Sequence, residues 1–403
     1  MEHGTIKPVD ASLTVAIVSS YPPRPCGVAV VAEGLASVLP REDIQPWIAA
    51  VNEHGARYEY GPEVVWQFRE DAVEDYQRVA AAINHSGVDV VNLQHEFAIY
   101  GEHEFNEGGE WTDHIIEFVN RLEVPLVTTL QTVSPQPNRP ARHIVRTLCK
   151  RSAFAVVFSP PAARILVDRY DVPPSQIRVI WVGAPEIEPL PRERAKQALG
   201  LEGRLILATF GFMAPDKGVE DLLEGLPAVV RQYPNVLCLL LGPTHPAYQR
   251  SWKDDYVARL MAQVRALKLD AHVRFENRYM RSSEIVPYLQ ATDICVIPYR
   301  DREELGSGAL SWAMAAGCAV VSTPFLYAQD VLANGKGVLT PFRSPQALSL
   351  AINDLASDSE RRQIMGEQAR RFARQMEWRE VGKQYAVLFR QVAHRTSSSA
   401  PNN

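Results

Sequence analysis

The sequence lacks the features that mark disulfide-bonded, zinc-binding or membrane-spanning proteins. Its five cysteines are odd in number and widely spaced, without a CxxC pair or a Cys/His cluster, so we expect neither a disulfide framework nor a zinc site. No apolar run reaches the roughly 18 residues that span a bilayer. The first residues, MEHGTIKPVD, lack the apolar core of a signal peptide. We therefore expect a cytoplasmic protein without a transmembrane segment.

The chain also lacks a strong excess of charge of either sign. It has 42 Lys and Arg against 47 Asp and Glu, a formal net charge of −5. A nucleic-acid-binding protein carries a basic footprint, so we predict no nucleic acid partner. No Walker motif and no paired-aspartate metal motif occurs, and we predict neither a cofactor nor an essential metal. The oligomeric state is not specified by the sequence.

What the chain does contain is apolar residues, 46% of its 403, enough for two domains with large cores. Short apolar runs alternate with amphipathic segments throughout, which predicts an α/β fold with parallel, doubly wound sheets. Strands are expected at 13–20, 48–51, 88–93, 126–130, 153–158 and 177–182, and again at 205–211, 236–242, 273–277, 293–299, 318–322 and 336–341.

The proline-rich, charged stretch GAPEIEPLPRER is typical of an interdomain linker. We predict one Rossmann-like domain at 1–186 and a second at 187–375. A cleft between these domains is the natural place for an active site. Residues 376–395 are expected to form a C-terminal helix, and residues 396–403 a disordered tail.

The stretch from Tyr299 to Pro324 concentrates the chemistry of the second half. A strand at 294–298 leads into a charged loop with Gly306-Ser307-Gly308, and a helix follows at 309–316. Glycine at a helix start leaves amides free for an anion; an ordinary strand-to-helix turn is the alternative. Lys217, before another helix, is a candidate phosphate ligand or else a solvated lysine. Glu304 could accept hydrogen bonds from sugar hydroxyls, so the pair suggests a nucleotide sugar.

In the first half, polar residues follow three expected strands. Gly27 closes the loop SYPPRPCG before a helix, where it admits a ligand or serves as a packing glycine. His95 and Glu96 follow the strand at 88–93, and Gln131 follows the strand at 126–130. The adjacent His95-Glu96 pair is a binding or acid/base site, or a structural pair on a loop. The basic helix at 139–151 could sit on anionic lipid headgroups as a peripheral contact, or present a solvated face.

These residues resemble the GT-B glycosyltransferases of family 4, the glycosyl transferases group 1, across almost the whole chain. The matching segments are SYPPRPCGVAVVAEGLASVL, LATFGFMAPDKGVEDLLEGL, LLLGPTHP, VRFENRYMRSSEIVPYLQATDICVIPY and the loop with AMAAGCAVVST. The resemblance implies the GT-B fold, two Rossmann-like domains facing across a cleft, and a C-terminal helix, here MEWREVGKQY, that crosses back to the first domain.

The resemblance also implies roles for individual residues. Lys217 would contact the donor diphosphate, Glu304 the donor sugar, and Arg278 with Tyr279 the base. The donor-binding set is Gly211, Phe212, Lys217, Arg278, Tyr279, Glu304, Gly306, Ser307, Gly308, Ala309, Leu310 and Trp312. The acceptor or sugar side comprises Gly27, His95, Glu96 and Gln131, and the catalytic candidates are Glu304, Lys217 and His95.

Three positions depart from the family pattern. Trp312 takes the place of a second glutamate that normally binds ribose hydroxyls, Phe212 that of an arginine that partners Lys217, and Gln131 that of a histidine. One lost charged phosphate contact would cost about 1.5–3 kcal/mol of donor affinity if uncompensated. The strings YPPRPCG, QHEFAIYG and GSGALSWAMAAG also resemble a divergent bacterial subgroup associated with mannosyl transfer.

The implied function is transfer of a sugar, mannosyl among the candidates, from a nucleoside-diphosphate sugar to a hydroxyl of a carbohydrate or glycan acceptor. The resemblance also implies retention, for which no dedicated base is required because a donor phosphate oxygen can take the acceptor proton. His95 or Glu96 acting as a base would suit an inverting enzyme instead. The alternatives are a non-catalytic nucleotide-sugar-binding partner protein, for which Trp312 and Phe212 argue, and a hydrolase or epimerase of the nucleotide sugar.

Overall fold

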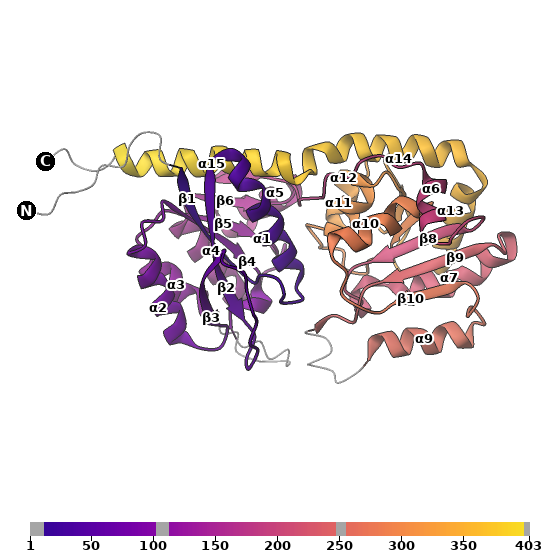
Figure 1. Ribbon diagram of the computed structural model, residues 1–403, viewed down its shortest axis with the longest axis horizontal. Coiled ribbons are helices and arrows are strands. Elements are labelled where there is room, and N and C mark those ends of the chain that lie inside the picture. The colour runs from indigo at the N-terminus through magenta and orange to yellow at the C-terminus, as the bar shows by residue number, and fades with distance from the viewer. Residues whose placement is uncertain (1–11, 102–112, 247–254, 399–403) are drawn as a thin grey trace, which may run out of the picture. The chain divides into compact units, whose positions relative to one another are not determined.

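The computed structural model describes residues 12–101, 113–246 and 255–398. Its chain divides into two compact units (Figure 1). The first comprises Met1–Ile180 with Val381–Asn403, and the second Trp181–Glu380. The sequence-based domain limits, at 186/187 and 375/376, remain predictions.

The first unit is organised around a seven-stranded sheet in the order β3-β2-β1-β4-β5-β6-β7. Every pairing within it is parallel. The strands are β1 Leu13–Ser19, β2 Ile44–Asn52, β3 Val64–Arg69, β4 Val90–His95, β5 Leu126–Leu130, β6 Phe154–Val157 and β7 Ile177–Val179. The strand order reverses between β1 and β4, the switch point where open parallel sheets bind ligands.

Two features of this sheet differ from the sequence-based prediction. Strand β3 was missed because it lies at the sheet edge and alternates exposed residues with half-buried or buried ones, whereas the prediction relied on continuous apolar runs. Strand β4 continues through Gln94 and His95, both fully buried. The expectation that these two residues lie in a loop is therefore wrong, because their polar side chains are accommodated inside the unit.

Helices lie on both sides of the first sheet (Figure 1). They are α1 Gly27–Val38, α2 Val73–Asn84, α3 Ile115–Arg121, α4 Arg139–Arg151, α5 Pro160–Tyr170 and, from Val381 on, α15 Trp378–Ser398. Helix α15 packs closely, because a Cβ on Gly382 would lie 2.6 Å from Val38. Residues 396–398 are helical, so the expected tail is wrong there; residues 399–403 lie outside the described residues.

The basic helix α4 forms over the predicted residues. Its apolar side, with Ile144, Val145 and Leu148, is buried. Arg142 and Arg146 are exposed and both contact Asp171. The apolar residues are thus committed to the core, while a lipid contact through the basic side remains untested. Among the described residues, none of the helices combines the length and apolarity needed to cross a bilayer.

The second unit holds a six-stranded parallel sheet in the order β10-β9-β8-β11-β12-β13. Its strands are β8 Leu205–Phe210, β9 Val236–Leu241, β10 Val273–Glu276, β11 Ile294–Ile297, β12 Ala319–Ser322 and β13 Val338–Leu339. The order again reverses once, between β8 and β11. Cys238 and Cys295 are buried in these strands, and Cys318 is buried directly before β12.

Several helices of the second unit begin at a residue whose side chain caps them. The helices of this unit are α6 Arg192–Ala198, α7 Val219–Gln232, α9 Tyr256–Ala266, α10 Ser282–Ala291, α11 Gly308–Ala315, α12 Leu326–Val331, α13 Pro345–Ser357 and α14 Ser359–Ala373. Ser344 caps α13 as predicted, its hydroxyl accepting from the Ala347 amide at 3.3 Å.

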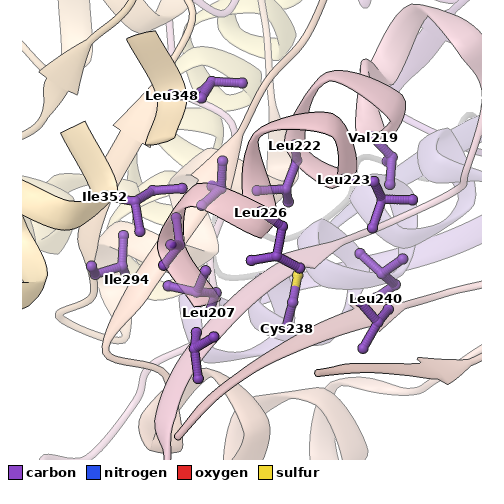
Figure 2. Close-up of a cluster of buried hydrophobic side chains, with 14 of the residues drawn as sticks. Leu207, Val219, Leu222, Leu223, Leu226, Cys238, Leu240, Ile294, Leu348 and Ile352 are labelled. Atoms are coloured by element: carbon purple, nitrogen blue, oxygen red, sulfur yellow. The ribbon is translucent and has the colours of Figure 1, made fainter. Parts of the chain in front are cut away.

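A single apolar cluster fills one side of the second sheet (Figure 2). Helix α7 contributes Leu222, Leu223 and Leu226, which stand three and four residues apart and so share one helix face. They meet Cys238 of β9 and Ile352 of α13. This packing holds β8 and α7 rigidly, and the loop between them carries Lys217.

Replacing Leu226 tests how far the second unit depends on this cluster. Leu226 is fully buried, so we expect Leu226→Ala to lower the free energy of unfolding by about 2–5 kcal/mol through lost burial and a residual cavity. The matched control is Leu350→Ala, a side chain that is 62% exposed and should change stability by no more than about 0.5 kcal/mol. Urea unfolding followed by circular dichroism measures both, and equal losses would contradict the assignment of the core.

Candidate functional site

Two charged residues meet at the switch point of the second sheet. Strands β8 and β11 are neighbours there, and the loops that leave them carry Lys217 and Glu304. The Lys217 ammonium donates to Oε2 of Glu304 at 3.0 Å, and Oδ2 of Asp216 lies 2.9 Å from the same nitrogen. The structure thus brings together the two residues that sequence reasoning placed at the centre of a donor site.

The charge on Lys217 is well supported. Burial lowers the pKa of its ammonium, but Glu304, the Tyr299 phenol and Asp216 outweigh that effect and hold the pKa well above the ordinary value of 10.5. The Lys217 nitrogen also lies 4.3 Å from the centre of the Tyr299 ring, a cation–π contact. A quarter of the side chain stays exposed. Lys217 is therefore a fixed positive charge that a ligand can still reach.

The two loops are held against each other by backbone contact. Gly218 has φ +67°, and a Cβ there would lie 2.0 Å from the carbonyl oxygen of Pro298. Only glycine allows both this dihedral angle and this approach. The amide of Arg300 donates to the Asp216 carbonyl at 2.6 Å. The loop that carries Lys217 is therefore fixed to the segment that leads to Glu304.

A bidentate ion pair strengthens this connection. The Arg300 guanidinium donates to both carboxylate oxygens of Asp221, at 2.6 and 2.9 Å, and to the Pro215 carbonyl at 3.3 Å. Asp221 lies in the first turn of α7, directly after Gly218. Such a planar, two-point contact fixes orientation as well as distance. Arg300 and Asp221 therefore fix the loops that carry Lys217 and Glu304, and act on these two side chains through the backbone.

The glycine-rich loop ends in a helix start with free donors. The Ser307 hydroxyl accepts from the Leu310 amide at 3.2 Å and caps α11. In the described part of the chain, the amides of Gly308 and Ala309 have no hydrogen-bond acceptor, as expected in the first turn of a helix. A Cβ on Gly308 would meet nothing within 4 Å. These amides suit an anion, as the sequence predicts.

Aromatic side chains gather beyond the ends of β8, β9 and β10. The Phe212 ring stacks on Tyr279, with centres 6.2 Å apart and planes inclined by 27°, and meets His245 edge-on at 5.3 Å. Tyr279 is 36% exposed. Arg278 is also exposed and pairs with Glu284 at 2.5 Å. Phe212 thus stands where an arginine was expected and forms part of an aromatic surface.

Trp312 has a structural environment. Its side chain is buried in the middle of α11, and its indole N–H donates to the Gly183 carbonyl at 3.2 Å. Gly183 is packed tightly, because a Cβ there would lie 2.2 Å from the Trp378 ring. Trp312 thus ties α11 to the segment at the start of the second unit. That it also binds the donor remains a prediction.

The first unit presents Gly27 at the exposed start of α1, after the switch-point strand β1. A Cβ on Gly27 would meet nothing within 4 Å, so the alternative of a packing glycine is wrong, and room for a ligand remains. The preceding loop is held by Arg24, which is 3% exposed and bonds Glu70 at 2.9 Å, Glu53 at 3.3 Å and the Val51 carbonyl at 2.9 Å. Sequence reasoning did not identify Arg24.

His95 is enclosed by the unit. Its Nε2 lies 3.0 Å from Oδ2 of Asp113, and its ring packs against Phe97 and Tyr100. Because a carboxylate accepts, Nε2 carries the proton in this pair. The Nδ1 atom is buried and has no hydrogen-bond partner among the described residues. This geometry therefore does not favour a direct catalytic contact between the His95 imidazole and a substrate.

Gln131 and Glu96 join a polar network at the carboxyl ends of β4 and β5. The Gln131 amide donates to Gln94 at 2.8 Å, and Gln94 donates to Asn92 at 2.6 Å. Thr132 donates to Glu96 at 2.6 Å. Gln131 and Glu96 are thus fixed in orientation beside the switch point. Their proposed acceptor contacts remain predictions.

Sequence reasoning missed the residues that position the site. Arg24, Asp113, Asp221 and Arg300 act through partners far away in sequence, and no local motif marks them. The proximity of Asp221 to Gly218, in the first turn of a helix after a glycine, was the one available signal. Among the described residues, no cluster of three or more His, Cys, Asp or Glu could hold a metal ion; independence from a metal stays a prediction.

Comparison with known proteins agrees with this geometry. Residues 191–372, which include Lys217, Glu304 and the α11 helix start, match the family described as glycosyl transferases group 1. The match covers less than half of the whole chain, and this part of the chain is similar to that family. The match covers nearly all of the second unit, so the part of the chain that is similar to this family contains the charged pair and the free amides.

Two curated relatives each align with about half of the chain. Spore coat protein SA of Bacillus subtilis is 28% identical over 45% of this chain and 47% of its own length. A D-inositol 3-phosphate glycosyltransferase of Corynebacterium urealyticum is 30% identical over 55% of this chain and 53% of its own. The chain therefore spans about half the length of these relatives in alignment.

A solved structure matches over more of the chain. Anabaena Alr3699/HepE, crystallised in complex with UDP and glucose, aligns with 94% of this chain and all of its own, with a TM-score of 0.73 at 17% identity. At this identity the likeness establishes the fold alone. Together with the two parallel sheets it confirms the predicted GT-B class of two Rossmann-like, doubly wound units.

Replacing Gly218 tests whether the backbone contact fixes the site. Gly218→Ala places a Cβ against the Pro298 carbonyl, whereas Gly200→Ala, at φ +64° with nothing within 4 Å, introduces the same dihedral strain in open space. We expect Gly200→Ala to cost about 1–2 kcal/mol, and Gly218→Ala to cost about 1–3 kcal/mol more because of the overlap. Chemical denaturation of both variants measures the difference. Equal costs would show that the loops separate freely.

Proposed function

We propose that this protein transfers a sugar from a nucleoside-diphosphate sugar to a hydroxyl of a carbohydrate acceptor, with retention of anomeric configuration. The observation that carries the proposal is the Lys217–Glu304 pair, 3.0 Å apart beside the free amides of Gly308 and Ala309. A cation and helix amides suit a diphosphate, and a carboxylate suits sugar hydroxyls. The match of residues 191–372 to the family glycosyl transferases group 1 supports the reaction class.

In the proposed reaction the bond between the sugar and the diphosphate breaks as negative charge develops on the leaving phosphate. Lys217 and the amides at the start of α11 stabilise that charge, and donors already in place lower the barrier without further reorganisation. Glu304 accepts hydrogen bonds from the sugar hydroxyls and orients the ring. A phosphate oxygen of the donor takes the proton of the attacking hydroxyl, so that no side chain serves as the base.

The buried state of His95 favours retention over inversion. An inverting transfer needs a base within hydrogen-bond reach of the acceptor hydroxyl, and His95 is fully enclosed with Nε2 committed to Asp113. Glu96 already accepts from Thr132 and from the Phe97 amide. Both residues then support the acceptor side through position, while the chemistry takes place at the donor phosphate.

The first test uses variants of the charged pair. If each side chain contributes about 3 kcal/mol in the transition state, Lys217→Ala and Glu304→Ala each lower kcat/KM by roughly a hundredfold. The exposed residues Lys150 and Glu224 give matched controls, Lys150→Ala and Glu224→Ala, which should keep wild-type kinetics. Wild-type turnover in both site variants would remove the site assignment.

Ligand binding is measured with a thermal-shift panel of GDP, UDP, ADP and their sugars. We expect one base to stabilise the protein, and Lys217→Ala to abolish that shift. The panel includes GDP-mannose because the mannosyl assignment rests on sequence resemblance. It therefore tests the donor sugar as well as the base. If no nucleotide or nucleotide sugar of the panel raised the melting temperature, the donor site would be contradicted.

The pH dependence of binding follows from the raised pKa of Lys217. A group whose folded-state pKa lies above its ordinary value keeps its stabilising charge below that value, 10.5 here, and loses it only as the pH rises through the folded pKa. The contribution of Lys217 to diphosphate binding should therefore be constant from about pH 6 to 9. Titration of the Lys217→Ala and wild-type proteins in parallel measures it. A Lys217-dependent loss within this range would contradict the fixed charge.

A second candidate is a nucleotide-sugar-binding protein without turnover. It is favoured by Trp312, which fills the place of the ribose-binding glutamate and is buried, and by a relative named as a spore coat protein. Product analysis separates the candidates. Released nucleotide with glycosylated acceptor supports the transferase, free sugar without acceptor indicates a hydrolase, and binding without any product indicates a binding protein.

A further inference from the structure

A concave site on the second unit shares no residue with the candidate donor site. It is a groove of about 530 Å³, within the range of small-molecule pockets. It lies between the turn after α12 and the end of α14, and its polar lining consists of Asn334, Lys336, Gln368, Arg371, Arg374 and Gln375. We refer to it as the basic groove.

One wall of the basic groove is a stripe on α14 and the turn that follows. Gln368, Arg371, Phe372 and Gln375 stand at positions i, i+3, i+4 and i+7, so they share one helix face. The core-facing side of α14 is a different one, with Met365, Ala369 and Ala373 buried, and the stripe in the groove lies on an exposed side. Here it carries a cation and two carboxamides on the surface, which core packing does not require.

The opposite wall is a tight turn with left-handed backbone. Asn334 has φ +59° and Gly335 has φ +82°, and a Cβ on Gly335 would lie 3.0 Å from Oε1 of Gln368. Consecutive left-handed residues are sparsely populated and persist where the surroundings impose them. The turn thus places Asn334 and Lys336 directly over the stripe on α14.

The charges of the basic groove are unbalanced. Arg371 and Arg374 are exposed, and within the described residues neither forms an ion pair, in contrast to Arg361 on the same helix, which pairs with Asp354 at 2.5 Å. No acidic residue is among those that line the groove. The Lys336 ammonium donates to the Ala333 carbonyl, and burial lowers its pKa by more than Asp330 raises it, so its charged form gains from a further anion. Three cations that repel one another attract a negatively charged ligand.

The remaining lining residues narrow the class of ligand. The carboxamides of Asn334, Gln368 and Gln375 suit hydroxyl groups, since each both donates and accepts hydrogen bonds. Phe372, the aromatic residue of the lining, has the Lys336 ammonium 4.8 Å from its ring centre and Trp181 packed edge-on at 5.6 Å. It therefore offers no free face to a nucleobase.

We propose that the basic groove binds an acidic carbohydrate, in which phosphate or carboxylate groups meet Lys336, Arg371 and Arg374 while hydroxyl groups meet the three carboxamides. The proposal goes beyond the transferase reaction and does not depend on it. The ligand comes either from an acidic glycan or from a free sugar phosphate, and the two sources share the chemistry that the groove recognises.

Calorimetric titration of the full-length protein with three probes tests the proposal. Tetragalacturonate represents an acidic glycan, glucose 6-phosphate a sugar phosphate, and maltotetraose a neutral control. Titrations are made at low ionic strength, because salt screens exposed charges. We expect at least one acidic probe to bind wild type about tenfold or more tightly than maltotetraose, and the better acidic probe identifies the source.

Variants assign the binding to the groove. The double variant Arg371→Gln/Arg374→Gln should weaken the acidic probe by on the order of tenfold or more, and Lys336→Gln gives an independent loss should the double variant not fold. Arg231→Gln/Arg361→Gln removes two charges elsewhere in the unit and should bind as wild type. Lys217→Ala should also bind as wild type, which separates this site from the donor site.

Three outcomes would overturn the proposal. The first is that the acidic probe binds wild type and both groove variants equally well. The second is that maltotetraose binds as tightly as the acidic probes. The third is that no probe binds at concentrations up to about 10 mM. Loss of binding in Lys217→Ala together with retention in the groove variants would place the acidic probe at the donor site. Melting temperatures measured without probe confirm that each variant is folded.

Discussion

The candidate site depends on the close approach of the Gly218 backbone to the Pro298 carbonyl. Strands β8 and β11 are neighbours at the switch point, but strand pairing alone does not keep the loops beyond them together. The missing side chain of Gly218 allows contact, and the Arg300–Asp221 pair holds it from the other side. The separation of Lys217 and Glu304 is a consequence of these contacts, since neither loop has a regular partner of its own.

This arrangement brings one cation against two carboxylates. Lys217 has Glu304 and Asp216 within 3.0 Å, so the local charge is negative and a diphosphate is not attracted by Lys217 alone. The amides at the start of α11, with the dipole behind them, supply positive potential without a counter-charge. The helix start and Lys217 must therefore act together, which explains why both lie at one end of the same sheet.

Much of the fold could be predicted from the sequence because buried parallel strands are continuous apolar runs. Strand β3 was missed because this edge strand alternates exposed residues with half-buried or buried ones. His95 was misplaced because a polar residue at a strand end looks like the start of a loop. Lys217, Glu304 and the loop to Leu310 were identified from local motifs. Arg24, Asp113 and Arg300 were not, because each acts through tertiary contacts that leave no local pattern.

Two of the three departures from the family pattern, Trp312 and Phe212, are built into the packing around them. Trp312 fills a buried space and donates to Gly183, and Phe212 stacks on Tyr279. A glutamate at position 312 would bury a carboxylate where an indole donates to a carbonyl, which is costly without a new partner. Restoring the family residues would therefore not restore the family's contacts. If a donor binds here, its affinity rests on Lys217, the helix amides and aromatic stacking more than on paired charges.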